Sequence, residues 1–202
     1  MKTRRIRIFA GPNGSGKSTL MKIIAAVEQP DQGRVTKANS VKVGLLSQVD
    51  KADPNSTVGD VVIGDRAKHE WASDPRIREI FTGLFGSFDD HIFDRTFASL
   101  SGGERQMLAI SRALISDPSF LLLDEPTAAL SPLYQQQIIE RIDNLRKEGI
   151  TVLIVEQNAR LSLARSDRGY IFANGKVVHT GDADFILNDP EIGEYFLGSH
   201  DD

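Results

Sequence analysis

The chain has 202 residues, 40% hydrophobic and 26% charged, and its 28 acidic and 24 basic side chains give a formal net charge of −4. This length and composition predict one globular domain with a substantial core, and the slight acidic excess gives no reason to expect nucleic acid as a partner. The absence of cysteine excludes disulfides, thiol nucleophiles and thiolate metal sites.

No apolar stretch approaches the roughly 20 residues needed to cross a bilayer, so we expect no direct membrane insertion. The basic start, residues 1–5, is not followed by the longer apolar segment of a secretory signal. Any membrane role is therefore expected to come through a partner.

Short apolar runs alternate with helical periodicity along the first half of the chain. Between residues 50 and 99 the helical stretches are broken by Asp, Pro and Gly, which predicts a helical lobe inserted into an α/β core. The expected elements, in chain order, are a strand at 6–10, a glycine-rich loop at 11–16, a helix at 17–27, strands at 34–37 and 41–47, and lobe helices at 58–68 and 75–85.

The core resumes in the second half, where the apolar run 120–123 is typical of a central parallel strand. Ser131-Pro132 indicates a helix start, because Ser can cap free N–H groups and Pro presets φ. Asn174-Gly175 indicates a two-residue hairpin. The further elements expected are helices at 103–115 and 132–147 and strands at 120–123, 151–155, 170–173 and 177–180.

Alternating strands and helices predict an α/β fold with a mostly parallel central sheet. We expect a single domain, with its core in residues 1–49 and 100–180. The helical lobe would cover residues 50–99, and a helical tail residues 181–202.

The loop after the first strand matches the phosphate-binding pattern in full and lies between a predicted strand and a helix. Its glycines let backbone N–H groups curl around phosphate oxygens, and the helix start adds its positive dipole end. Lys17 is expected to reach the β- and γ-phosphates, and Ser18 to ligate Mg²⁺. A glycine-rich turn that binds nothing is the plain alternative. The residues expected to bind nucleotide here are Gly11, Pro12, Asn13, Gly14, Ser15, Gly16, Lys17, Ser18 and Thr19.

The apolar run 120–123 ends in two carboxylates, Asp124 and Glu125, at the end of a strand where parallel sheets bind ligands. Asp124 is expected to hold Mg²⁺, directly or through water, and Glu125 to orient and polarise the attacking water. A strand that merely ends in acidic surface residues is the alternative, and the phosphate loop makes it the weaker one.

A second anion-binding helix start is expected at Ser101, Gly102, Gly103 and Glu104, where a capping Ser and two glycines precede an amphipathic helix. One chain has a single triphosphate to bind, so this second start is explained if it serves a neighbour's nucleotide. Taken alone, Ser-Gly-Gly is more often a plain turn and cap.

Residues 100–106, after a phosphate loop and ahead of the Leu-Asp-Glu-Pro run, resemble the signature of the ABC ATPase family, and the resemblance covers nearly the whole chain. It implies ATP and Mg²⁺ as the bound groups. It also places Gln48 in the Q-loop, which couples magnesium to the helical lobe, and residues 129–131 in the D-loop. Gln157 falls at the switch position after the next strand.

The same resemblance implies two copies, or one copy and a related ABC subunit, arranged antiparallel. Two ATP molecules would then lie between residues 11–18 of one copy and residues 101–104 of the other.

The second half also resembles the ATPase subunits of bacterial branched-chain amino-acid importers, through residues 155–159, 167–170, 188–191 and 195–198. That likeness implies transmembrane permease subunits as partners and a cytoplasmic location at the inner face of the membrane.

Two other resemblances concern the first half. Residues 28–35 and 43–48 resemble ABC-F translation factors, and residues 5–19 resemble the loop of zeta-toxin-type kinases. Together they suggest a shortened or composite, even engineered, sequence.

Three positions depart from the ABC pattern. ABC domains, which are P-loop NTPases, normally carry antiparallel strands ahead of the phosphate loop, but only ten residues precede Gly11 here, so these strands are expected to be reduced. None of the ten is a clear counterpart of the aromatic side chain that stacks on adenine, since Phe9 is expected in the core. Losing that stacking would weaken ATP binding by roughly 1–3 kcal/mol, by analogy with bases stacked on aromatic side chains. Gln157 stands where His is usual, so it can donate a hydrogen bond but carry no charge. Ser131 stands where many relatives have Asp.

The leading hypothesis is an ATPase that energises a transporter. A nucleotide-binding scaffold with little turnover is the first alternative, and an ABC-F-like translation factor is the second. A small-molecule kinase is the weakest, because the signature has no role in that mechanism.

Overall fold

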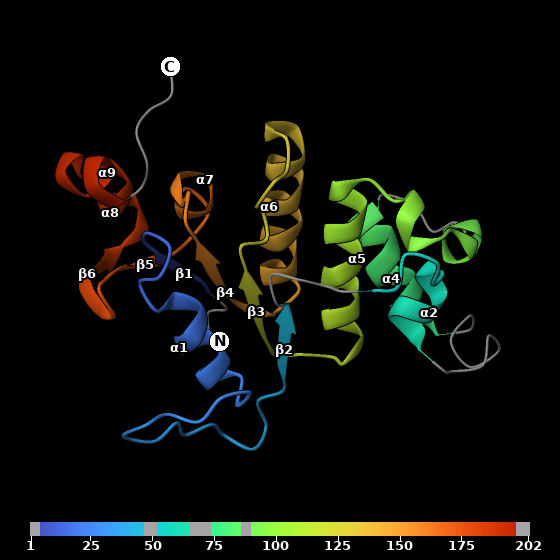
Figure 1. Cartoon of the computed structure of the whole chain (residues 1–202), viewed down its shortest axis with the longest axis horizontal. Coiled ribbons are helices and arrows are strands. Elements are labelled where there is room, and N and C mark those ends of the chain that lie inside the picture. Colours follow the sequence, from blue (N-terminus) through green and yellow to red (C-terminus); the bar gives the residue numbers. More distant parts are fainter. Residues whose placement is uncertain (1–4, 47–51, 65–73, 86–89, 197–202) are drawn as a thin grey trace.

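The computed structural model describes residues 5–46, 52–64, 74–85 and 90–196. A six-stranded sheet of order β2-β3-β4-β1-β5-β6 forms the centre, and a group of helices lies beyond its β2 edge (Figure 1). All neighbouring strands are parallel except the last pair, β5 and β6. The strands are β1 Ile6–Ala10, β2 Val43–Leu46, β3 Phe120–Asp124, β4 Thr151–Glu156, β5 Arg168–Ala173 and β6 Lys176–Asp182.

Helices cover both faces of this sheet, so the predicted α/β class is confirmed. Within the described ranges, no helix is long and apolar enough to cross a bilayer. The helices are α1 Lys17–Ile24, α2 Val58–Ile63, α4 Pro75–Phe85, α5 Gly102–Ile115, α6 Pro132–Lys147, α7 Arg160–Leu163, α8 Ala183–Asn188 and α9 Pro190–Phe196, with 3₁₀ turns η1 Asp90–Asp94 and η2 Phe97–Ser99.

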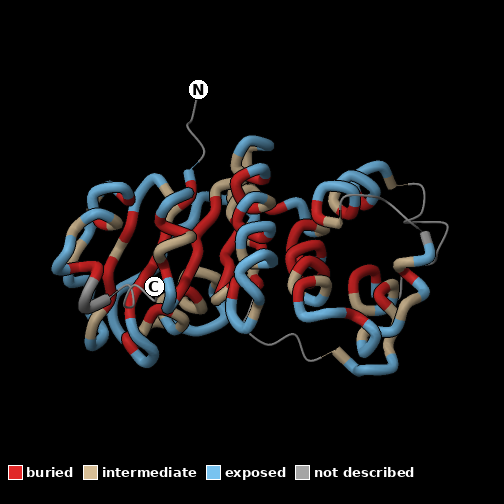
Figure 2. Tube along the Cα trace, turned by 90° about the horizontal axis from the view of Figure 1, so that it is seen from above, coloured by how far each residue is buried: buried red, intermediate tan, exposed pale blue. Residues whose placement is uncertain are grey.

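The alternation of side chains along β1 divides the core into two layers. Ile6 and Ile8 point to the face covered by α6, α7, α8 and α9, where the larger apolar cluster lies. Phe9 points to the opposite face, where it packs with Met21 of α1 and Leu153 of β4. Figure 2 shows buried residues concentrated along the strands. Among the described helices, α1 alone contributes to the cluster around Phe9, so this face of the sheet is thinly covered.

Helix α5 joins the sheet to the helical lobe. Its Leu108 belongs to the lobe cluster with Phe81 and Phe93, whereas its Ile110 belongs to the larger core of the sheet. Gly44 lets α5 approach β2 closely, because a Cβ there would lie 2.9 Å from the Ala113 carbonyl oxygen. The lobe is therefore attached to the sheet through a shared helix.

Most expected elements are present, but residues 34–37 form no strand and are exposed. A strand needs a partner for its backbone N–H and C=O groups, and no described strand pairs with this stretch. A second expectation was wrong at Ser131, which takes the N-cap position of α6 but makes no capping hydrogen bond through its hydroxyl. Pro132 occupies the first turn as expected.

The hairpin between β5 and β6 turns at Asn174 and Gly175, both with positive φ, as the sequence predicted. The expected helix at 17–27 ends earlier, at Ile24, and the helix expected at 58–68 is described only from Val58 to Ile63.

Candidate functional site

The phosphate loop leaves the end of β1 and enters α1. Its geometry depends on glycine: Gly11, Gly14 and Gly16 all have positive φ, and a Cβ on Gly11 would lie 2.2 Å from the Phe172 carbonyl oxygen. Lys17 is only 4% exposed, and its Nζ donates to the carbonyl oxygens of Gly11 at 2.7 Å and Pro12 at 2.9 Å. The lysine is thus held inside the curve of the loop.

Two of the three residues predicted to hold magnesium, Ser18 and Asp124, lie together, although 106 positions separate them in sequence; the third is Gln48. Ser18 donates a hydrogen bond from Oγ to Oδ1 of Asp124 at 3.0 Å, which joins the start of α1 to the end of β3. Asp124 is 3% exposed, and this burial raises the pKa of its carboxyl group, while the bond from Ser18 opposes the rise. The oxygen donors and the anionic surroundings fit a hard divalent cation.

Burial lowers the pKa of Lys17, and the neighbouring carboxylates, led by Glu125, oppose this change. Lys17 therefore lies at the centre of an acidic cluster.

Glu125 adopts a conformation that is unusual for its residue type. Its φ is 46°, in the left-handed region, and its N–H donates to the Val155 carbonyl oxygen of β4 at 2.8 Å. Such strain costs about 1–3 kcal/mol and is concentrated at functional sites. This conformation ends β3, so the chain turns at Glu125, whose side chain is half-buried.

A further carboxylate of this site, the buried Glu156 at the end of β4, was missed in the sequence. It is 3% exposed, and its Oε1 accepts hydrogen bonds from the backbone N–H of Thr127 at 3.1 Å and from the Thr127 hydroxyl at 2.8 Å. It therefore fastens the segment that follows Glu125. The available signal was an acidic residue ending the apolar run of a central strand.

Burial raises the pKa of Glu156 to about 7 from 4.5, and the Thr127 bonds oppose the rise. The folded state then binds more protons than the unfolded state between these two values, so we expect the free energy of unfolding to fall as the pH rises from about 4.5 to about 7. Glu156→Gln keeps an acceptor for Thr127 and should flatten this dependence. Urea unfolding of both proteins at several pH values, without nucleotide, measures it; parallel curves would contradict the assignment.

The signature helix begins as a capping box. The Ser101 hydroxyl accepts from the Glu104 N–H at 3.2 Å, and the Glu104 carboxylate accepts from the Ser101 N–H at 2.7 Å. Arg95 donates to the same carboxylate at 2.6 Å and, as the main cause, lowers the pKa of Glu104 to about 2. The carboxylate is thus committed to the helix start, which favours a positioning role for Glu104 over direct nucleotide binding. The Ser-x-x-Glu spacing was the signal for this box.

Ser101 and Gly102 are exposed, so this helix start is open to an incoming molecule. Behind them Gly103 is buried, and a Cβ there would lie 2.4 Å from the ring of Tyr134 on α6. Leu130, in the segment assigned to the D-loop, lies near Gly102, since a Cβ on Gly102 would be 3.6 Å from Cδ2 of Leu130.

Gln157, another predicted site residue, lies at the end of the sheet where the phosphate loop and Asp124 also lie. Gln157 directly follows β4 and is exposed. Because β4 pairs with both β1 and β3, Gln157 follows a strand that lies between the phosphate loop and Asp124. Ala129 has a φ of 57°, which marks a tight D-loop. Gln48 lies outside the described residues. Phe9 is a core residue as predicted, 8% exposed and packed against Tyr170 and Phe172.

The insertion of β4 between the phosphate-loop strand and the Asp124 strand, with a second exposed helix start beyond β2, defines the class: a P-loop nucleotide-binding domain of the ABC type. The comparisons agree, since the ABC transporter family profile matches residues 1–128. The chain belongs to the ABC transporter family.

Among its relatives is the high-affinity branched-chain amino acid transport ATP-binding protein BraG of Pseudomonas aeruginosa, 33% identical over 225 aligned positions that cover 98% of this chain and 90% of that protein. The lipopolysaccharide export ATP-binding protein LptB of Haemophilus influenzae is 32% identical, covering 93% and 83%. A solved ATP-binding cassette of an ABC transporter, in its ADP conformation, has a TM-score of 0.77 at 27% identity, covering 94% and 86%.

These matches give no support to a composite origin or to an ABC-F-like first half. The transport-type relatives match 98% and 93% of the chain, both halves together. The alignment with BraG spans 225 positions, more than the 202 residues of this chain, so the relative carries stretches that have no counterpart here.

Proposed function

We propose that this chain is the ATP-hydrolysing subunit of a branched-chain amino-acid importer and works as a head-to-tail dimer. The relatives named above support a role in transport. The arrangement of the two anion-binding helix starts is the observation that supports the dimeric mechanism.

Both helix starts lie at the same end of the sheet, the one formed by the carboxyl ends of its parallel strands. The phosphate loop follows the end of β1, and α5 ends only a few residues before β3 begins, so the α5 start lies toward the strand ends. The 14 residues of α5 span ~21 Å, comparable with the length of β3 and its connection.

The two helix starts are nevertheless far apart across the sheet. Strands β4, β3 and β2 follow β1 in the sheet order, which puts β2 ~14 Å from β1 at about 4.8 Å per strand, and α5 packs beyond β2. One triphosphate on the phosphate loop therefore cannot touch Ser101 of its own chain. A second copy turned head to tail brings its exposed Ser101 and Gly102 onto that triphosphate.

Within this site the chain's residues take distinct roles. Backbone N–H groups of residues 13–19 bind the β- and γ-phosphates, and Lys17 leaves its loop carbonyls to neutralise their charge. Ser18 and Asp124 hold Mg²⁺, which when bound shields the charge on the β- and γ-phosphates.

Two side chains act on the attacking water. Glu125 accepts its proton, and Gln157 donates a hydrogen bond to the γ-phosphate or the water. In the partner copy, Glu104 positions Ser101 of its own chain through the capping box.

The helical lobe, residues 50–99 together with α5, provides the surface for the permease, and Gln48 links it to the site. In this arrangement the protein is peripheral to the inner face of the membrane.

Four measurements test the proposal. Phosphate release from Mg-ATP should be detectable with the purified chain, and sedimentation should show dimers with ATP and monomers without it. A tagged chain should also co-purify with transmembrane permease subunits from solubilised membranes, and the reconstituted complex should import leucine only with ATP. Co-sedimentation with ribosomes in place of permease subunits would instead favour the ABC-F-like alternative.

A further inference from the structure

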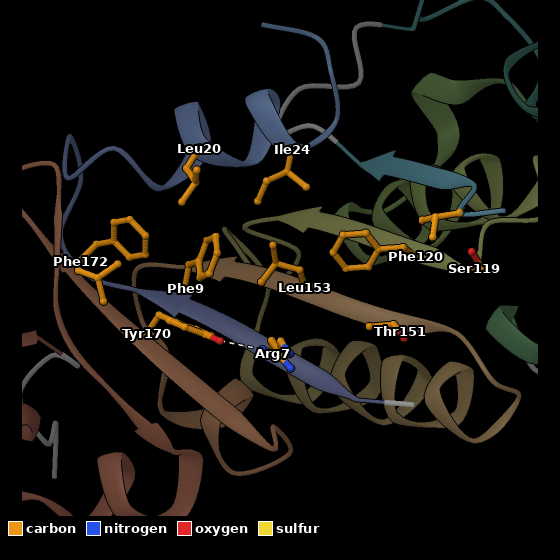
Figure 3. Close-up of a pocket in the computed structure, with 12 residues that line it drawn as sticks. Arg7, Phe9, Leu20, Ile24, Ser119, Phe120, Thr151, Leu153, Tyr170 and Phe172 are labelled. Atoms are coloured by element: carbon orange, nitrogen blue, oxygen red, sulfur yellow. Dashed lines mark hydrogen bonds between the residues drawn. The ribbon is translucent and has the colours of Figure 1, made fainter. Parts of the chain in front are cut away.

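The thinly covered face of the sheet contains a pocket of about 630 Å³, well inside the usual range for small-molecule sites of roughly 300–1,000 Å³ (Figure 3). Phe9, Leu153 and Phe120 form its floor on three neighbouring strands, and Leu20 and Ile24 of α1 hang above them. It extends from the beginnings of the strands, at Arg7, Ser119 and Thr151, to Phe172, whose carbonyl oxygen lies next to Gly11. None of the described residues predicted to bind phosphate or magnesium is among those that line it, so it is distinct from the phosphate-binding site.

Arg7 is the one charged residue among those that line the pocket. Its Nη1 donates to the Tyr170 hydroxyl at 2.7 Å, and the other guanidinium donors have no partner among the described residues. A second guanidinium lies beside it: Arg168 is the register partner of Arg7 on β5, and its Cζ lies 5.8 Å from the Tyr170 ring centroid. Two like charges thus leave the same face on adjacent strands, an unfavourable arrangement that an anion between them would relieve, and Asp182 of β6 is the register partner of Arg168 on its other side.

Two carboxylates lie near these arginines, and each accepts a backbone hydrogen bond. Asp167 accepts the N–H of Ile6 at 2.7 Å, and Asp182 accepts the N–H of Asp184 at 3.1 Å as the cap of α8. In the part of the chain that the structure describes, no carboxylate forms an ion pair with either arginine. The positive pair is therefore available to a ligand.

We propose that this pocket binds a small amphipathic anion, a carboxylate with an unbranched apolar tail of medium length. The carboxylate lies between Arg7 and Arg168, where planar guanidinium groups bind it with two parallel hydrogen bonds. The tail lies between α1 and the aromatic floor, where it removes apolar surface from water. Because Leu20 and Ile24 belong to the helix that carries Lys17 and Ser18, the ligand also braces the phosphate-loop helix against the sheet.

Isothermal titration calorimetry with sodium decanoate tests this site, below the concentration at which decanoate forms micelles. We expect one decanoate per chain. Decyltrimethylammonium has the same tail with the opposite charge and should bind at least about tenfold more weakly, since the two guanidinium groups repel its head group. Acetate, which has no tail, should show no binding.

Variants separate the head group from the tail. Arg7→Met keeps an apolar stem and should weaken decanoate binding about ten- to a hundredfold, the loss expected for a hydrogen bond to a charged group. Arg141→Met makes the same change on α6, across the sheet, and should leave it unaltered. Ile24→Trp fills the pocket from above and should also abolish binding. Circular dichroism confirms that each variant is folded.

Three results would overturn the proposal. One is equal affinity for decanoate and decyltrimethylammonium, and another is an Arg7→Met protein that binds decanoate as well as the native chain. The third is concentration-dependent dimerisation that Ile24→Trp abolishes, with no decanoate bound, because this face would then be an interface between copies. None of these results depends on ATP hydrolysis, so the pocket and the ATPase proposal can fail separately.

Discussion

Glu125→Gln is expected to lower the rate of phosphate release by about 10²–10⁴-fold, the usual contribution of a general base. Glutamine keeps the size of the side chain and the strained φ of 46° at this position but cannot take a proton from water. ATP affinity should stay nearly unchanged, because phosphate and metal contacts come from the loop, Ser18 and Asp124. ATP would then remain between two copies, and sedimentation with Mg-ATP should show a stable dimer.

Glu140→Gln is the matched control, since Glu140 is an exposed residue in the middle of α6 and is not among the residues of the nucleotide site. It should hydrolyse ATP at the native rate. Equal, slow phosphate release from the native, Glu125→Gln and Glu140→Gln proteins would favour the scaffold alternative, and a Glu125→Gln protein that stays monomeric with Mg-ATP would count against the dimer.

The sequence predicted those parts of the site whose chemistry is local. The phosphate loop needs glycines at positive φ and a lysine at a fixed spacing, so the local sequence of residues 11–18 is enough to predict it. Asp124 is predictable for a similar reason, because an apolar run followed by carboxylates marks the end of a buried parallel strand.

Long-range pairing was less predictable. Residues 34–37 have a strand-like composition but form no strand, because β-structure depends on a partner that composition does not reveal. The sequence also does not predict that β4 lies between β1 and β3, or that Glu156 is therefore buried beside Thr127. The paired arginines at the apolar pocket depend on the register of β1 with β5, which no local pattern specifies.

Mixing two inactive variants should restore hydrolysis if each site is built from two chains. Lys17→Met removes the phosphate-binding charge from one half of a site. Gly102→Asp puts a negative charge at the other half, where the triphosphate should meet the α5 start. An aspartate is acceptable in the first turn of a helix, and a Cβ at Gly102 has only ordinary contact with Leu130 at 3.6 Å, so the fold should persist.

Each variant alone has two defective sites per dimer and should release almost no phosphate. In a mixed dimer, the phosphate loop of the Gly102→Asp chain meets the intact Ser101 end of the Lys17→Met chain, so one complete site forms. Random pairing in equal amounts makes half of the dimers mixed with one intact site in each, which restores up to about a quarter of the native rate. Gly102→Asn, of the same shape without the charge, should impair hydrolysis much less than Gly102→Asp. If the mixture releases no more phosphate than the two variants do separately, the site is not shared between chains, since random pairing would have to create intact sites in any head-to-tail dimer.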